Sequence, residues 1–143
     1  MSRQMIYDWN EVRRDGSVIS SDFQLVDETP RDGIQSPSVR NPSIGEKLEL
    51  LHLMDQNKIQ CVDLGLPGAG AEAVSDVTRL CEEIRDQNLS VKPNCAGRTH
   101  PADINAIVDI SQKTGVEIEV CAFLGASPVR MAVENWDMGK MLK

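Results

Sequence analysis

Arg31 and Asp32 lie side by side in the stretch LVDETPRDGIQ, where a short apolar run passes into a charged turn. An aspartate on a turn is a hard oxygen ligand for a divalent cation. The neighbouring arginine is permanently charged and can stabilise an oxyanion that develops during a reaction. On spacing alone, a surface ion pair or an Asp-Gly turn is the preferred explanation. Asp27 and Glu28, just upstream, are expected to satisfy the strand end and its turn.

Further polar side chains lie at the ends of the predicted strands. In a parallel α/β protein the carboxyl ends of the strands meet at one face, where sites are built from the following loops. Ordinary turn and helix-capping roles explain the polar residues of any one of these loops. Four consecutive polar loops on one face favour an active site, of which they would form about half. Besides Arg31 and Asp32, the candidates are Gln35 after the first strand, Asp63 in the second, Arg98 and His100 after the third, and Ser127 after the fourth.

Strands and helices alternate from residue 23 onward. The predicted strands are Phe23–Glu28, Ile59–Gly65, Leu89–Cys95 and Val116–Gly125. The helices are expected from Ser43 to about Asn57, at Ala71–Gln87, from about Pro101 to Lys113, and from Ser127-Pro128 onward. Each crossover helix returns the chain in the same direction, so this order predicts an α/β fold with a parallel sheet. Two architectures fit: the first half of a TIM (β/α)8 barrel, or an open, flavodoxin-like doubly wound sheet.

Local signals support the first and third helices. Ser43 and Glu46 have the spacing of a capping box, and Gly115 is placed to end the third helix. Residues 1–22 precede the repeat and are treated as an extension that could form a short hairpin. Residues 23–143 are then about four βα units of one barrel domain.

Composition excludes several classes of partner. The chain has 143 residues and a formal net charge of -7, with no Lys/Arg run longer than two, so nucleic acid is not an expected partner. No stretch approaches the roughly 20 apolar residues that a membrane span needs, and the amino terminus lacks the apolar centre of a signal peptide. The four cysteines form no C-x-x-C pair, which favours a reducing cytoplasm and small buried side chains. Three of them, Cys61, Cys95 and Cys121, fall on predicted strands.

The stretch Gly68–Ala73 (GAGAEA) matches the dinucleotide pattern G-x-G-x-x-A. However, its strand does not begin the fold, and no acidic residue ends the next strand to hold a ribose. A tight turn with helix capping explains the glycines better.

Four motifs in order resemble the isopropylmalate synthase and homocitrate synthase group. That group belongs to the metal-dependent (β/α)8 barrels that also include 3-hydroxy-3-methylglutaryl-CoA lyase. The resemblance covers roughly residues 23 to 130 and rests on the segments LVDETPRDGIQ, CVDLGLPGAG, CAGRTH and VCAFLGASPVR.

The resemblance implies a cytoplasmic acyltransferase of amino-acid biosynthesis, which condenses acetyl-CoA with a 2-oxo acid and forms a homo-oligomer. It implies a divalent metal ion, magnesium, manganese or zinc, with Asp32 as the ligand. Arg31 and His100 match catalytic positions. Gln35, Asp63, Arg98 and Ser127 match positions that contact the substrates.

The sequence departs from the family pattern at three places. Pro30 stands where the synthases have Leu and the lyase branch has Pro, and Asp63 replaces a usual Glu. A late H-x-H pair of metal ligands is absent, since the only histidines are His52 and His100. His52 lies within a predicted helix, where packing or surface exposure is the expected role. We therefore expect the 143 residues to be the amino-terminal part of a longer enzyme and inactive alone. A lyase or aldolase that cleaves C–C bonds at the same site, and a non-catalytic half-barrel assembly module, are the alternatives.

Overall fold

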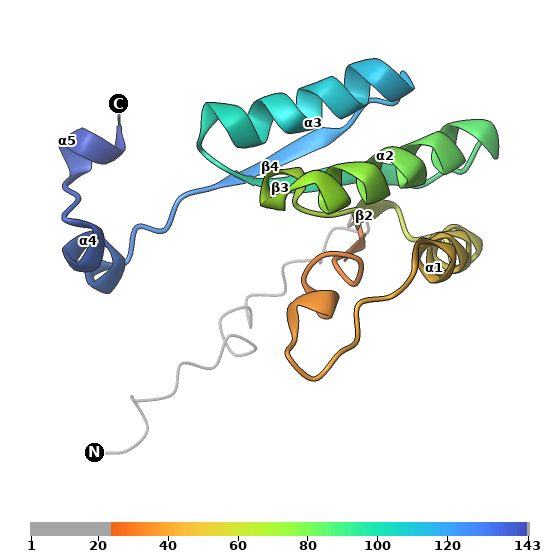
Figure 1. Cartoon of the computed structure of the whole chain (residues 1–143), viewed down its shortest axis with the longest axis horizontal. Helices are drawn as coiled ribbons and strands as arrows, with labels where there is room; N and C mark the ends of the chain where they lie inside the picture. Colours follow the sequence, from red (N-terminus) through yellow and green to blue (C-terminus); the bar gives the residue numbers. More distant parts are fainter. Residues whose placement is uncertain (1–23, 143) are drawn as a thin grey trace, which may run out of the picture.

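A four-stranded parallel sheet forms the centre of the molecule (Figure 1). The computed structural model describes residues 24–142, so the hairpin proposed for residues 1–22 lies outside it. The strands are β1 (Val26–Asp27), β2 (Cys61–Asp63), β3 (Lys92–Arg98) and β4 (Glu119–Phe123), in the order β1-β2-β3-β4.

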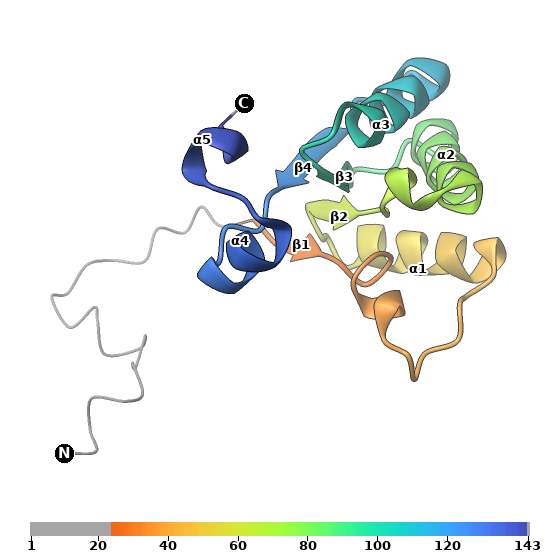
Figure 2. The ribbon, with the colours of Figure 1, turned by 60° about the vertical axis from the view of Figure 1, so that its left-hand side comes forward.

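Three long helices lie side by side along one face of this sheet, as both ribbon views show (Figures 1 and 2). They are α1 (Ile44–Gln56), α2 (Ala71–Asp86) and α3 (Pro101–Thr114). Two short helices, α4 (Pro128–Glu134) and α5 (Met138–Met141), follow β4 and lie apart from the others. Single 3-10 turns, η1 (Gly33–Gln35) and η2 (Pro67–Ala69), follow β1 and β2. Within residues 24–142, none of the helices combines the length and apolar character needed to cross a bilayer.

The order of the strands decides between the two predicted architectures. A flavodoxin-like sheet places its second strand outside the first and has helices on both faces. Here the four strands follow one another in sequence order, and α1, α2 and α3 cover the same face. This arrangement is that of the amino-terminal half of a TIM barrel. The half-barrel prediction is confirmed, and the open doubly wound sheet is wrong.

Helix ends follow the predicted signals. The Ser43 hydroxyl accepts a bond from the Glu46 N–H at 3.4 Å, while the Glu46 carboxylate accepts the Ser43 N–H at 2.8 Å. These reciprocal bonds confirm the capping box that starts α1. Gly115 ends α3 at φ 73°, in the left-handed region that glycine adopts without a steric penalty.

The hydrophobic core lies between the sheet and the three long helices. Val62 and Cys95 face it from the strands, Leu64 faces it from the residue after β2, and all three are almost fully buried. The helices contribute Leu51, Met54, Val77, Leu80, Cys81, Ile84, Ile107 and Ile110. On the opposite face, the half-exposed side chains of Val26 and Phe123 mark the side that would become the interior of a closed barrel.

Cys121 corrects one prediction. Cys61, Cys81 and Cys95 are buried as expected, but Cys121 is exposed. It pairs in register with Ala96 on the uncovered side of the sheet, away from the face that Cys95 shares with the helices. A strand assignment alone does not say which of two faces a helix covers, and Cys121 lies on the face without one.

The predicted strand boundaries are also shifted. All four strands begin two or three residues later than expected, and β3 ends at Arg98 rather than at Cys95. Its last five residues, Asn94–Arg98, pair continuously with β4. Arg98 is therefore the last residue of a strand, whereas the sequence placed it in the loop that follows.

Candidate active site

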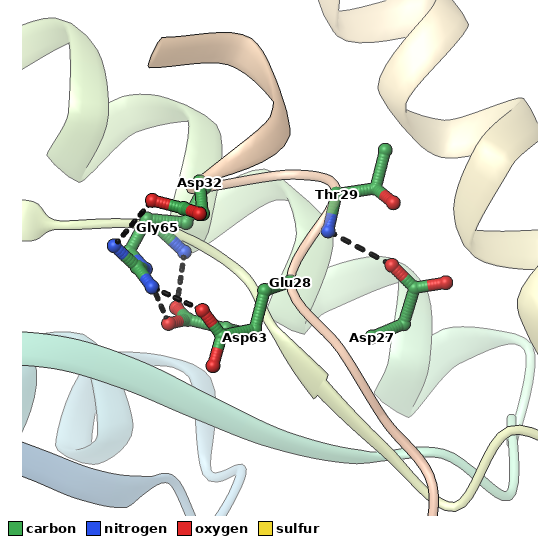
Figure 3. Close-up of polar contacts among 7 residues, drawn as sticks. Asp27, Glu28, Thr29, Asp32, Asp63 and Gly65 are labelled. Atoms are coloured by element: carbon green, nitrogen blue, oxygen red, sulfur yellow. Dashed lines mark hydrogen bonds and ion pairs between the residues drawn. The ribbon is translucent and has the colours of Figure 1, made fainter. Parts of the chain in front are cut away.

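The turn after β1 is built around the backbone carbonyl of Glu28. This oxygen accepts bonds from the N–H groups of Arg31, Asp32 and Gly33 at 3.1, 2.7 and 3.2 Å. The Asp27 carboxylate accepts the Thr29 N–H at 2.8 Å (Figure 3). Asp27 thus satisfies the turn, as predicted, and the tight backbone directs the next side chains towards the end of β2.

Arg31 joins three carboxylates at this place. Its Nε donates to Asp63 Oδ2 at 2.6 Å, and its terminal nitrogens contact Glu28 and Asp32 (Figure 3). Asp63 lies at the end of β2, with 4% of its side chain exposed, and also accepts the Gly65 N–H at 3.2 Å. The structure therefore brings together Arg31, Asp32 and Asp63 from two successive strand ends. Glu28 joins them through its side chain, a role beyond the one expected for it.

The charges of the central pair depend on their burial. Desolvation raises the pKa of Asp63, and the hydrogen bonds from Arg31 and Gly65 offset this only in part. Desolvation lowers the pKa of Arg31, but the hydrogen bonds and negative charges of Asp63 and Glu28 together outweigh it, so that the pKa of Arg31 is raised. Arg31 is thus a fixed positive charge, oriented by a carboxylate that water scarcely reaches.

Asp32 is the exposed member of the cluster, with 66% of its side chain accessible. It precedes η1 in the N-cap position, yet its side chain makes no capping hydrogen bond. Its contact with Arg31 is long, at 3.4 Å. The ordinary structural role of an aspartate in such a turn is therefore not used here, and the carboxylate is accessible to a ligand.

A divalent cation would need more ligands than this cluster supplies. Among residues 24–142, no three His, Cys, Asp or Glu side chains are placed so that they could hold one metal ion. Asp32 offers one hard oxygen donor, whereas Asp63 is committed to Arg31. The described residues can supply one ligand of a metal site and do not form a complete site.

Gln35 lies at the end of η1 and lines a small cavity beside the cluster. The cavity has a volume of about 150 Å³ and is also bordered by Arg31, Ile34 and Leu66. Lys47 and Asp76 close its inner side through an ion pair of 2.6 Å between α1 and α2. Gln35 is thus a neighbour of Arg31, as expected of a residue of the same site.

The candidates from the third and fourth strands occupy a separate cleft. Arg98, His100 and Ser127 line a hollow of about 790 Å³, together with Phe123, Arg130 and Trp136. The pocket around Arg31 shares none of these residues. The chain therefore brings its predicted site residues together in two groups along the strand ends.

Two residues of this second group have clear structural roles. His100 Nδ1 accepts the Ala102 N–H at 3.2 Å and caps α3. Ser127 Oγ accepts the Arg130 N–H at 3.1 Å and caps α4. Helix capping of this kind is sufficient to explain a polar residue in a single loop. A contact of either side chain with substrate would be a second role.

Arg98 is held by Asp103, a residue that the motifs did not single out. Its Nε and one terminal nitrogen donate to the two Asp103 oxygens, both at 2.8 Å, and its backbone N–H donates at 3.0 Å. Asp103 lies in the first turn of α3 and is 2% exposed. Sequence reasoning missed it because an aspartate near a helix start is ordinarily solvated. Its spacing of five residues from Arg98 was the one signal that could have pointed to the pair.

Gly68 explains why the glycine-rich turn after β2 needs glycine. A Cβ at this position would lie 2.5 Å from Asp103 Cγ and 2.6 Å from Oδ1. Gly70 precedes α2 at φ 138°, again a conformation that glycine favours. The tight turn thus has structural reasons, in agreement with the preference for a turn over a dinucleotide site.

Replacing Gly68 by Ala is expected to displace the Asp103 carboxylate and break its bonds to Arg98. We expect the midpoint of thermal unfolding to fall by roughly 5–10 °C, because the added Cβ clashes with the buried side chain of Asp103. Gly45→Ala is the matched control, because a Cβ at Gly45 meets only Ser43 Oγ at 4.0 Å. An unchanged midpoint in Gly68→Ala would show that Asp103 is not held against this turn.

The Arg98–Asp103 pair predicts a sensitivity to acid. Bonds from Arg98 lower the pKa of Asp103 from 3.8 to about 2. Because the folded pKa lies below the unfolded one, the pair stabilises the protein above about pH 4 and loses this effect as the pH falls towards 2. Wild type should therefore be more stable than Asp103→Asn near pH 6, with the difference vanishing by pH 2. Asp109→Asn, an exposed change on the same helix, should give no such pH dependence.

His52 takes no part in either group. Its Nε2 lies 2.9 Å from Glu83 Oε1, which joins α1 to α2 on the helical side of the sheet. The packing or surface role expected for it is confirmed.

Comparison with known proteins identifies the family. The model of the HMGL-like family matches residues 22–139. The chain belongs to the HMGL-like family. A 2-isopropylmalate synthase of Staphylococcus saprophyticus is 24% identical over 111 residues, which are 78% of this chain and 20% of the relative. Homocitrate synthase AksA of Methanopyrus kandleri is 33% identical over 86 residues, 59% of this chain and 20% of the relative.

This HMGL-like chain spans about a fifth of the length of those two curated relatives. No solved structure gives a significant match. The family resemblance inferred from the four motifs is confirmed, and the matched residues include both groups of candidate side chains.

Proposed function

We propose that the complete protein is a metal-dependent synthase that condenses acetyl-CoA with a 2-oxo acid. The observation that carries the proposal is the Arg31–Asp63 pair, 2.6 Å apart, beside the exposed carboxylate of Asp32. Two synthases among the similar proteins support the direction of the reaction. The polar strand ends are on the side where TIM-barrel enzymes place their active sites.

Asp32 and Arg31 have distinct roles in this proposal. Asp32 supplies one ligand to a divalent cation, magnesium, manganese or zinc, and the other ligands come from outside the described residues. When bound there, such a cation would supply Lewis-acid polarisation of the keto group of the acid. Arg31 places a fixed guanidinium beside it, where it stabilises negative charge on the acid and on the alkoxide of the product. Asp63 holds Nε of Arg31 and so sets the orientation of its outer nitrogens.

The second cleft suits the acyl-CoA. It combines the cationic side chains of Arg98, Arg130 and Lys140 with the apolar surface of Phe123 and Trp136. A thioester with a phosphate-bearing carrier needs both kinds of contact. We assign Arg98, His100 and Ser127 to this substrate, and Gln35 to the 2-oxo acid beside Arg31.

Lyase chemistry is the second candidate, because Pro30 occupies the position at which the lyase branch has proline. Pro30 is buried in the turn and borders the same cavity as Arg31. A lyase would use the same Arg31 and Asp32 to cleave a 3-hydroxyacyl-CoA.

An assay of both directions tests the proposal. The complete protein, supplied with manganese, is incubated with acetyl-CoA and a panel of 2-oxo acids, and free thiol is measured. In parallel, it receives 3-hydroxy-3-methylglutaryl-CoA, and formation of acetyl-CoA is measured. Thiol release that depends on a 2-oxo acid supports the synthase. Cleavage without any such release would replace it with the lyase.

A further inference from the structure

Asn94 carries an unused hydrogen-bond acceptor in the interior. The residue lies in the middle of β3 and is 4% exposed. Its side-chain oxygen Oδ1 is buried and has no hydrogen-bond partner, and no other buried side-chain atom among the described residues shares this property. An unsatisfied buried acceptor destabilises the folded state, because it has lost its hydrogen bonds to water without replacement. A bound ligand with a hydrogen-bond donor would satisfy this oxygen.

The strand register places Asn94 beside the Arg31 cluster. Asn94 pairs with Asp63 on β2 and with Glu119 on β4. Residues paired across parallel strands point to the same face, so the Asn94 side chain lies on the face from which Asp63 binds Arg31. The next residue, Cys95, faces the helices and is fully buried in the core. Asn94 thus faces the barrel interior, directly next to the proposed acid site.

The neighbours of Asn94 restrict the kind of group that it can bind. Carboxylates flank it in both directions across the sheet, at Asp63 and Glu119. Arg31 balances the charge of Asp63, but a second carboxylate on the ligand would meet like charge at Glu119. An alkyl chain would leave Oδ1 unpaired. A neutral hydroxyl donates a hydrogen bond and brings no charge.

We propose that Asn94 determines substrate specificity by accepting a hydrogen bond from a hydroxyl group on the side chain of the 2-oxo acid. This inference rests on the proposed function, and it names the class of acid: hydroxylated, rather than branched alkyl or dicarboxylic. Arg31, and Asp32 through the cation, would hold the 2-oxo carboxylate end that all these acids share, while Asn94 contacts the variable side chain in the barrel interior.

Matched substrates test this specificity in the complete protein. In 2-oxopentanoate, a methyl group replaces the hydroxyl of 4-hydroxy-2-oxobutanoate, and 2-oxoglutarate adds a carboxylate. We expect kcat/KM for thiol release to favour the hydroxy acid over the other two by roughly 10–100-fold. Equal rates, or a preference for 2-oxopentanoate, would overturn the role of Asn94.

The variant Asn94→Leu has nearly the same shape without the acceptor. We expect it to lose the preference for the hydroxy acid, and to unfold at a higher temperature than wild type when no substrate is present. Thr114→Val is the control, because Thr114 is equally buried but its hydroxyl is bonded to the Ile110 carbonyl at 2.8 Å. It should lower the unfolding temperature and keep the preference. An Asn94→Leu variant that keeps the preference contradicts the inference.

Ligand-induced thermal shifts separate this inference from the proposed reaction. A stabilisation by the hydroxy acid that exceeds the one by 2-oxopentanoate, and that Asn94→Leu abolishes, supports the role of Asn94 even without thiol release. The absence of thiol release would in that case refute only the synthase reaction. Equal stabilisation by the two acids would refute the role of Asn94 whatever the reaction.

Discussion

Replacing Asp32 by Asn in the complete protein is expected to lower metal-dependent thiol release from acetyl-CoA by at least about 100-fold. The amide keeps the size of the side chain but removes the charge that we propose as a ligand of the cation. Folding should be unaffected, because the carboxylate is exposed and makes no capping bond. The unfolding temperature should therefore stay within about 2 °C of wild type.

Asp27→Asn is the matched control for this change. Asp27 lies five residues upstream, at the end of β1, and accepts the Thr29 N–H through Oδ1. An asparagine oxygen can accept the same bond, so turnover should stay at the wild-type level. Full turnover in Asp32→Asn would remove Asp32 from the catalytic site.

The second large effect is expected for Arg31→Lys. Lysine keeps the positive charge but lacks the planar guanidinium group, whose several N–H donors allow Arg31 to contact Asp63, Glu28 and the substrate together. It also leaves the buried Asp63 without its 2.6 Å partner. We expect kcat to fall by about 100- to 1,000-fold, with a smaller change in KM, because in the proposed reaction the contact of Arg31 is strongest with the developing alkoxide.

The control for Arg31→Lys is Arg40→Lys. Arg40 also binds a carboxylate, with two contacts to Glu46, but 74% of its side chain is exposed and it lies outside both clefts. It should keep wild-type kcat and stability. If Arg31→Lys keeps more than half of the wild-type kcat, Arg31 is a structural ion pair, the explanation first preferred from the spacing.

The parts of the fold that rest on local chemistry could be predicted from the sequence. The capping box of Ser43 and Glu46, the glycine that ends α3, and the alternation of strands and helices each follow from a few neighbouring residues. The strand order and the side that the helices cover depend on long-range packing. For that reason Cys121 was expected inside and lies exposed.

The group of candidate residues around Arg31 could be predicted from the sequence. Arg31, Asp32 and Asp63 converge because each follows or ends a parallel strand. The carboxyl ends of parallel strands lie at the same edge of a sheet, and this rule can be applied to a sequence alone. The roles of Asn94 and Asp103 could not be foreseen in the same way, because each depends on burial. From the sequence alone, Asn94 and Asp103 are both expected to be solvated, because asparagine and an aspartate near a helix start are usually exposed. The structure shows that both are buried.

The most direct measurement follows a labelled acetyl group through the reaction. The complete protein is incubated with manganese, 13C-labelled acetyl-CoA and a 2-oxo acid, and the products are analysed by mass spectrometry. The synthase assignment predicts a 2-hydroxy diacid that contains the labelled acetyl unit, formed only with metal present and not by Asp32→Asn. Labelled acetate alone, or the same diacid after complete removal of metal with a chelator, would contradict it.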